Sequence, residues 1–119
     1  MRCTDVRLFF PLLVLAASPG AAVGAPVVQG IGTSKCEYLT PEDFTTSASV
    51  GQWVLGYYSG ALNMNIGFAL SQGMPDEVTQ KAADFDVPTV LESVRAFCVS
   101  NPSIRLYQAA SGIVTMVLE

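Results

Sequence analysis

The sequence predicts a small all-α protein, a bundle of three to four short helices tied by one disulfide. Three observations support this prediction. Apolar residues recur at helical spacing, no long strand-like alternation occurs, and two cysteines remain once an expected leader is removed. A chain of 119 residues also holds at most one small domain, which excludes a large enzyme.

Residues 1–25 have the features of a secretory signal peptide. Arg2 and Arg7 precede an apolar run at residues 8–17, and a stretch of small residues follows it. The run is too short to span a bilayer as a stable helix. We expect cleavage near residues 22–25 and a free periplasmic product without membrane insertion.

The expected mature chain is acidic. Removal of residues 1–25 takes away Arg2, Arg7 and Asp5, which leaves four basic and nine acidic side chains and a net charge of −5. Nucleic acids and anionic membrane surfaces attract basic patches, so neither is an expected partner.

Cys36 and Cys98 are the cysteines left for an oxidising compartment, because Cys3 lies in the leader. Two cysteines have one possible connectivity, and a disulfide is the expected state. Closing so long a loop stabilises a fold by about 4 kcal/mol in the chain-entropy model. A redox or metal pair is the alternative, but no CxxC motif and no histidine accompany these cysteines.

The first segments carry turn and capping signals. Residues 26–35 are rich in small and turn-forming residues without periodicity, and we expect a flexible lead-in there. The domain is expected to span residues 36–119. It opens with a short turn or helix that has Thr40 as N-cap and Pro41 at the first helical position.

A charge-free run from Phe44 to Pro75 holds the central helix, for which Ser47 or Ser49 is the expected cap. Its apolar residues recur at helical spacing: Val50, Trp53, Val54, Tyr57, Tyr58 and Leu62, with Ala61 on the same face. They are the candidate hydrophobic surface for a client or a dimer. Core packing is nevertheless the more common role of such a pattern. Gly56 and Gly60, four residues apart, predict close packing against another helix or the disulfide loop.

A transmembrane helix is the alternative for residues 51–70. Polar side chains are scattered through this run, and its aromatic residues lie inside it rather than at its ends. A spanning helix would also place Cys36 and Cys98 on opposite sides of a membrane, where they cannot pair. We therefore favour a helix of a soluble protein.

Gly73 and Pro75 are expected to end the central helix, and Asp76 and Glu77 to open a short helix that fades by Asp84. The next helix is predicted to begin at the N-cap Asp86, with Pro88 in its first turn and one apolar stripe: Val87, Val90, Leu91, Val94 and Cys98.

The last helix is predicted to begin with Asn101 as N-cap and Pro102 at its first position. It continues almost to the end of the chain through a second apolar stripe: Leu106, Ala110, Ile113, Val114 and Val117.

No catalytic residues, metal ligands or cofactor are expected. The expected mature chain lacks histidine, and a disulfide leaves it no free thiol. The neighbouring carboxylates Asp84 and Asp86, like Asp76 and Glu77, are better explained as helix caps and solvated groups than as an acid/base pair.

Four stretches taken together resemble the HdeA/HdeB-like family of small periplasmic proteins: "CEYL", "WVLGYYSGALN", "DFDVPTVLESV" and "FCVSNPSIRLYQAASGIV". The resemblance covers about residues 36–118. It implies an all-helical fold with one disulfide, here Cys36 with Cys98. It also implies an ATP-independent chaperone that protects unfolded or acid-stressed periplasmic proteins. Such a chaperone can act as a homodimer.

Such an activity needs no cofactor. Asp and Glu titrate near pH 4, so a shift to about pH 2 takes the expected mature charge from −5 towards +4. Repulsion then loosens the helices or a dimer, and the apolar stripes become available to clients.

Two alternatives remain open. The Gly-Tyr-x-x-Gly helix also resembles Tai-type periplasmic immunity proteins, which implies an inhibitor-type binding protein against a cell-wall-active enzyme. A structural protein of the envelope is the third possibility. Acid-dependent client binding favours the chaperone, whereas a tight complex with one enzyme at neutral pH favours the inhibitor.

Overall fold

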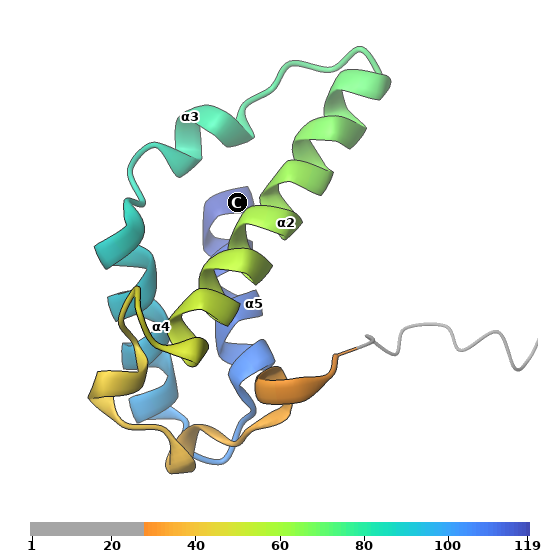
Figure 1. Ribbon diagram of the computed structural model, residues 1–119. Helices are drawn as coiled ribbons and strands as arrows, with labels where there is room; N and C mark the ends of the chain where they lie inside the picture. The colour runs from red at the N-terminus through yellow and green to blue at the C-terminus, as the bar shows by residue number, and fades with distance from the viewer. Residues whose placement is uncertain (1–27) are drawn as a thin grey trace, which may run out of the picture.

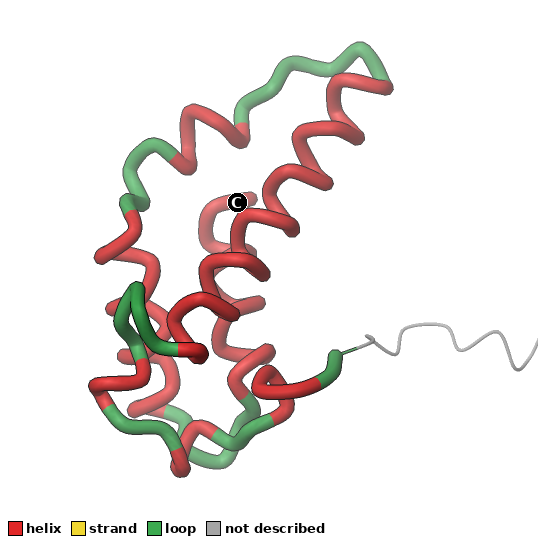
Figure 2. Tube along the Cα trace, in the orientation of Figure 1, coloured by secondary structure: helices red, strands yellow, loops and turns green. Residues whose placement is uncertain are grey.

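The structure is a computed structural model that describes residues 28–119, so the predicted leader at residues 1–25 lies outside the described residues. The described part contains four α-helices, three 3-10 helices and no strand (Figures 1 and 2). The α-helices are α2 (Ser49–Ser71), α3 (Val78–Ala82), α4 (Val87–Ser100) and α5 (Leu106–Leu118), and the 3-10 helices are η1 (Gly30–Thr33), η2 (Cys36–Tyr38) and η3 (Pro41–Asp43). The predicted all-α fold is confirmed.

Helix α5 is the centre of the packing, because it contacts both α4 and α2 as well as α3 and η1. In Figure 1 it lies behind α2, with α4 beside it and α3 at the upper left, above α4. The apolar stripe predicted for α5 is buried throughout, and Leu106 and Ile113 are among the largest fully buried side chains. Burial of side chains of this size stabilises a fold by roughly 1.5–3 kcal/mol each.

The disulfide between Cys36 and Cys98 is present and joins η2 to α4, with the two α-carbons 5.0 Å apart. Both cysteines are buried, as the position of Cys98 on the apolar face of α4 predicts. The cross-link therefore fixes the N-terminal arm to the last turn of α4.

Residues 30–35, where a flexible lead-in was expected, pack against the rest of the domain. Gly32 is buried against the ring of Trp53, and a β-carbon at residue 32 would collide with that ring. The backbone of residues 34–37 pairs with residues 102–106, through Cys36 N–H to the Ile104 carbonyl at 2.8 Å and Leu106 N–H to the Ser34 carbonyl at 2.8 Å. Arg105 Nη1 also donates to the Thr33 carbonyl at 2.6 Å.

Two predicted helix starts are wrong. Helix α2 has Ala48 as its N-cap, instead of Ser47 or Ser49, and no side chain caps it. Helix α5 begins after Arg105 rather than at Asn101 and Pro102, because residues 101–104 form a turn and Arg105 is extended where it pairs with Lys35. The Gln108 side chain accepts from Arg105 N–H at 2.8 Å and satisfies one free donor of that start.

Other predicted starts are confirmed. Asp86 caps α4 by accepting from Thr89 N–H at 3.0 Å, and Pro88 lies in the first turn. Thr40 is the N-cap of η3, where its N–H donates to the Asp43 carboxylate at 2.7 Å. Val87 is the exception in the α4 stripe, because it is 44% exposed while the other four members are buried.

Gly56 and Gly60 do not mediate close helix packing, which corrects that prediction. Both are exposed, and an added β-carbon would meet no atom within 4 Å. They lie on the solvent face of α2, opposite the face that packs on α5. Among residues 28–119, no helix is long and apolar enough to cross a membrane.

Candidate functional site

The candidate hydrophobic surface lies mostly inside the fold. Val50, Val54, Tyr58 and Leu62 are buried core residues. Trp53 and Tyr57 are half-buried and stack on each other, with ring centroids 5.2 Å apart and planes at 21°. In the folded chain these residues belong mainly to the core, although the edges of Tyr58 and Leu62 also line an open groove.

Exposed apolar side chains occur instead on the second half of α2, where sequence analysis did not place them. Met64, Phe68 and Leu70 are 76%, 61% and 62% exposed, and Met74 follows in the next loop. This half of α2 extends past the end of α5 in Figure 1. The signal was present in the sequence, because apolar residues after Leu62 recur at every second position and do not fit one face of a helix.

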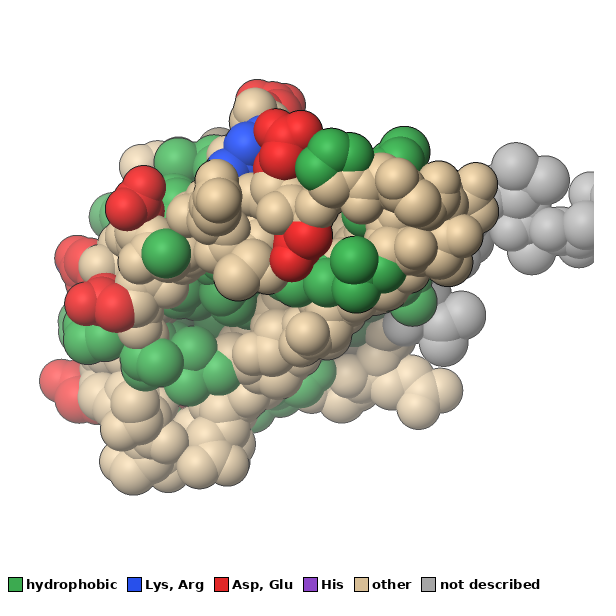
Figure 3. Space-filling view, turned by 90° about the horizontal axis from the view of Figure 1, so that it is seen from above, with side chains coloured by type: hydrophobic (Ala, Val, Ile, Leu, Met, Phe, Trp, Pro, Cys, Tyr) green, Lys and Arg blue, Asp and Glu red, His purple; other side chains and the backbone are tan. Residues whose placement is uncertain are grey.

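An open groove separates the second half of α2 from α3. Its volume is about 410 Å³, and its lining is mainly apolar: Tyr58, Leu62 and Ile66 from α2 and Ala82 and Ala83 from α3, with Ser59, Asn63 and Thr79 at its edges. Viewed from above, hydrophobic side chains lie in a hollow of this face, and acidic side chains flank it (Figure 3). Sequence analysis did not predict this groove, since it depends on how α3 folds back over α2.

Helix α3 is a short cover held by a few polar contacts. Asp76 accepts from the Thr79 hydroxyl at 2.6 Å and from Thr79 N–H at 3.2 Å. These hydrogen bonds keep the pKa of the Asp76 carboxyl below its usual value. At its other end, Lys81 Nζ donates to the Leu118 and Glu119 carbonyl oxygens at 3.4 and 3.1 Å, which links α3 to the end of α5.

Helix α4 has a similar acid-sensitive start. Hydrogen bonds from the Thr89 side chain and backbone keep the pKa of Asp86 below its usual value. One turn further, Glu92 accepts two hydrogen bonds from Arg95 at 2.6 and 2.8 Å, and this pairing lowers the pKa of Glu92. Both carboxylates are exposed, so their charged forms are favoured by local hydrogen bonds and not by burial.

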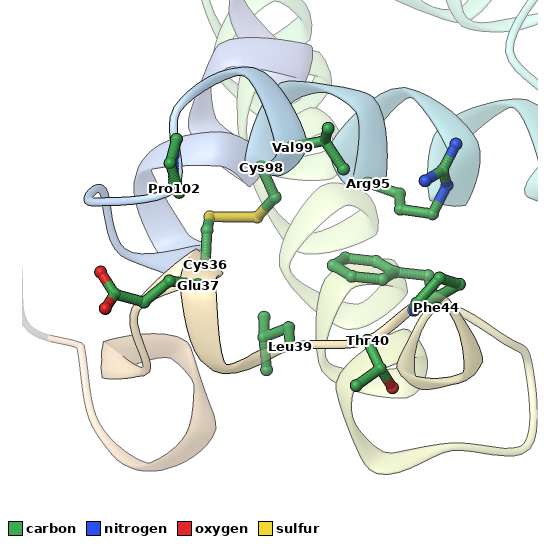
Figure 4. A pocket seen from close by; sticks show the side chains of 10 residues that line it. Cys36, Glu37, Leu39, Thr40, Phe44, Arg95, Cys98, Val99 and Pro102 are labelled. Atoms are coloured by element: carbon green, nitrogen blue, oxygen red, sulfur yellow. A yellow bond between two sulfur atoms is a disulfide. The ribbon is translucent and has the colours of Figure 1, made fainter.

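A second, smaller pocket of about 200 Å³ lies beside the disulfide (Figure 4). Phe44 and Leu39 form its apolar wall, opposite Cys98 and Val99. The Arg95 guanidinium at its edge points away from the disulfide in Figure 4, towards its ion pair with Glu92. Its one cationic group is therefore already neutralised.

The neighbouring carboxylates act as caps or stay solvated, as expected. Asp86 caps α4, and Asp76 accepts hydrogen bonds from Thr79 in the first turn of α3, whereas Glu77 and Asp84 are exposed. No group of three or more possible metal ligands occurs among residues 28–119.

Comparison of the chain with protein-family models, with curated proteins and with solved structures finds no match.

Proposed function

We propose that this protein is an HdeA/HdeB-like periplasmic chaperone that opens in acid and holds unfolding proteins without ATP. The observation that carries the proposal is the position of α3. This five-residue helix covers one side of the charge-free helix α2, and its start depends on the carboxylate of Asp76.

The distribution of charge supports an acid response. Residues 28–119 carry nine acidic and four basic side chains, and none of the charged groups in this range is buried. Protons reach every carboxylate without prior unfolding, so a shift to about pH 2 reverses the net charge from −5 towards +4. Like-charge repulsion then acts on a fold whose caps have been neutralised.

The lowered pKa values of two carboxylates determine how the stability of the fold changes with pH. The folded-state pKa values of Asp76 and Asp86 are lowered, so their contribution to stability is present above the unfolded pKa. It is lost as the pH falls through the folded pKa, and α3 and the start of α4 lose these caps together. Separation of α3 from α2 would expose the whole side chains of Tyr58 and Leu62, whose edges line the groove, next to the apolar residues already exposed on α2.

The disulfide limits how far the chain opens. Cys36 and Cys98 hold η2 on α4, and acid does not break this covalent link. An opened state that keeps helices and exposes apolar surface is the kind of partly folded state that binds other unfolding chains.

The test is sedimentation of a model client that is shifted to about pH 2 and returned to neutrality, with and without stoichiometric protein. A client that stays soluble and recovers supports the proposal. Equal pelleting in both tubes would refute it and would favour a search for a folded envelope enzyme as a partner at neutral pH.

A variant pair sharpens this test. Asp76→Asn keeps an oxygen acceptor for Thr79 but does not titrate, so opening should require a lower pH and protection should begin later. Glu42→Gln removes the same charge from η3, far from α3, and should protect like the original protein. Equal pH profiles for the two variants would exclude α3 as the acid-sensitive cover.

A further inference from the structure

The groove between α2 and α3 is open in the folded protein, before any acid-induced change. Three apolar or aromatic side chains from α2 lie about one turn apart along it: Tyr58, Leu62 and Ile66. Ala82 and Ala83 form the opposite wall, and their small side chains leave it shallow and accessible. A spacing of one helical turn matches the side chains of an amphipathic helix laid along the groove.

No charged side chain lines the groove, but an acidic rim is formed by residues next to the ones that line it. Asp76, Glu77, Asp84 and Asp86 all belong to α3 or its flanking residues, and α2 contributes no charge. Asp76 is hydrogen-bonded to Thr79, which itself lines the groove, and Asp84 directly follows Ala83. The one cation of α3, Lys81, is directed at the carbonyl oxygens of Leu118 and Glu119 at the end of α5.

Tyr58 adds a polar group that lacks a partner. Its side chain lines the groove and is 9% exposed, and its hydroxyl makes no hydrogen bond within the described residues. Burial raises the pKa of this phenol, so it stays neutral and can both donate and accept a hydrogen bond. The hydroxyl oxygen itself has almost no exposed surface, so it is an unsatisfied polar group beneath the groove and not a contact for a partner.

We propose that the α2–α3 groove binds a cationic amphipathic helical segment of another protein at neutral pH. The apolar face of the segment lies on Tyr58, Leu62 and Ile66, and its Lys or Arg side chains lie opposite the acidic rim. Complementary charge gives this interaction its selectivity and its fast association. The interaction uses the folded protein and goes beyond the acid-induced holding of unfolded clients.

Charge also argues against other occupants of the groove. A second copy would bring the rim carboxylates of one molecule towards those of the other, in a protein whose described residues carry a net charge of −5. An anionic membrane surface would be repelled in the same way. A cationic polypeptide is the partner that satisfies both the apolar floor and the acidic rim.

The experiment measures binding of a fluorescently labelled Leu/Lys peptide of about 18 residues, long enough to form an amphipathic helix on contact. A Leu/Glu peptide with the same apolar positions is the matched probe. The purified protein with its disulfide intact is titrated at pH 7 in low and in moderate salt, and anisotropy reports binding. We expect the Lys peptide to bind with a Kd of about 10 μM or tighter, to weaken about five- to tenfold in moderate salt, and the Glu peptide not to bind.

Two variant pairs locate the site. Glu77→Gln with Asp84→Asn removes two rim charges that make no side-chain hydrogen bond, and should weaken the Lys peptide about five- to tenfold. Glu37→Gln with Glu42→Gln removes the same charge at the opposite end of the molecule and should change Kd less than twofold. Ile66→Gln in the groove should weaken binding at least tenfold, whereas Met64→Gln on the outer face of α2 should not.

Several outcomes would overturn the proposal. These are equal binding of the two peptides, equal effects of the two charge pairs, or no binding of the Lys peptide up to about 1 mM. Self-association that Ile66→Gln abolishes would identify a second copy as the occupant instead. Because all measurements are made on the folded protein at pH 7, they succeed or fail independently of client protection at pH 2.

Discussion

The α-carbon of Gly51 lies directly against the carbonyl oxygen of Thr45, where the loop at residues 45–48 turns into α2. A β-carbon at this position would collide with a backbone atom that cannot rotate away. Ala48 N–H donates to the same carbonyl at 3.3 Å, and the Gln52 side chain donates to the Thr46 carbonyl at 3.1 Å. The start of α2 is thus defined by contact with this loop and not by a side-chain cap.

Gly51→Ala should therefore lower the free energy of unfolding by about 2 kcal/mol, the usual cost of forcing extra volume into a packed site. For a domain of this size, this corresponds to a Tm about 10 °C lower in a thermal melt followed by circular dichroism. An unchanged Tm would mean that the loop moves aside without cost.

Gly60→Ala is the matched substitution in the same helix, and it should have the opposite sign. The new β-carbon meets no atom within 4 Å, and alanine reduces the entropy lost on helix formation, so stability should rise by about 0.5–1 kcal/mol. Gly56→Ala should raise the stability by a similar amount. Destabilisation in urea titrations of either variant would restore the close-packing role that the sequence suggested.

Cys36→Ser should lower the free energy of unfolding by about 4 kcal/mol, because it opens a cross-link between residues 62 apart in sequence. The double variant Cys36→Ser with Cys98→Ser controls for the unpaired thiol that the single variant leaves at Cys98, and it should show a similar loss of stability. A urea midpoint equal to that of the original protein would show that the disulfide is dispensable for the fold.

Tyr58→Phe should raise the stability by about 1 kcal/mol, because it removes a buried hydroxyl that has no hydrogen-bond partner in the described structure. Tyr38→Phe is the control, since Tyr38 is 71% exposed and its hydroxyl is solvated. Chemical denaturation measures both. A clear loss of stability in Tyr58→Phe would indicate a hydrogen bond that forms in solution.

The dependence on pH can be tested at Asp86. Its lowered pKa means that the carboxylate stabilises the fold above the unfolded pKa and ceases to do so as the pH falls through the folded pKa. Asp86→Ala should therefore be less stable than the original protein at pH 7, and the difference should shrink as the pH falls through the lowered pKa of Asp86. Asp86→Asn keeps an acceptor for Thr89 N–H and should flatten the acid limb of the stability curve. A difference that persists at pH 2 would assign the effect to packing.

Local signals in the sequence were sufficient for much of this fold. Three predicted features are present: the apolar periodicity of α4 and α5, the cap at Asp86 and the disulfide. The first two depend on neighbours within a few residues, and the third follows because two cysteines allow only one pairing. The errors fall where distant segments meet. Arg105 starts α5 because residues 34–37 pair with the chain before it, and Gly32 is packed because Trp53 covers it.

The candidate groove was missed for the same reason. Tyr58 and Leu62 were identified as an apolar surface, but their exposure depends on how α3 lies over them, and α3 carries only a weak helical pattern. The neighbouring pair of Gly56 and Gly60 has the spacing of a contact motif, yet nothing in the local sequence distinguishes a helix face that meets another helix from one that meets water.

The disulfide also closes a covalent loop that persists in the unfolded chain. Cys36 and Cys98 close a loop that contains α2, α3 and most of α4; of the two paired segments, residues 34–37 straddle one end of this loop and residues 102–106 follow the other end. The longest-range contacts of the fold are thus kept within reach of each other even after the helices have separated. Closing the two ends of the domain no longer requires a search through a long flexible chain. Refolding after an acid-induced opening therefore does not require this loop to be closed again.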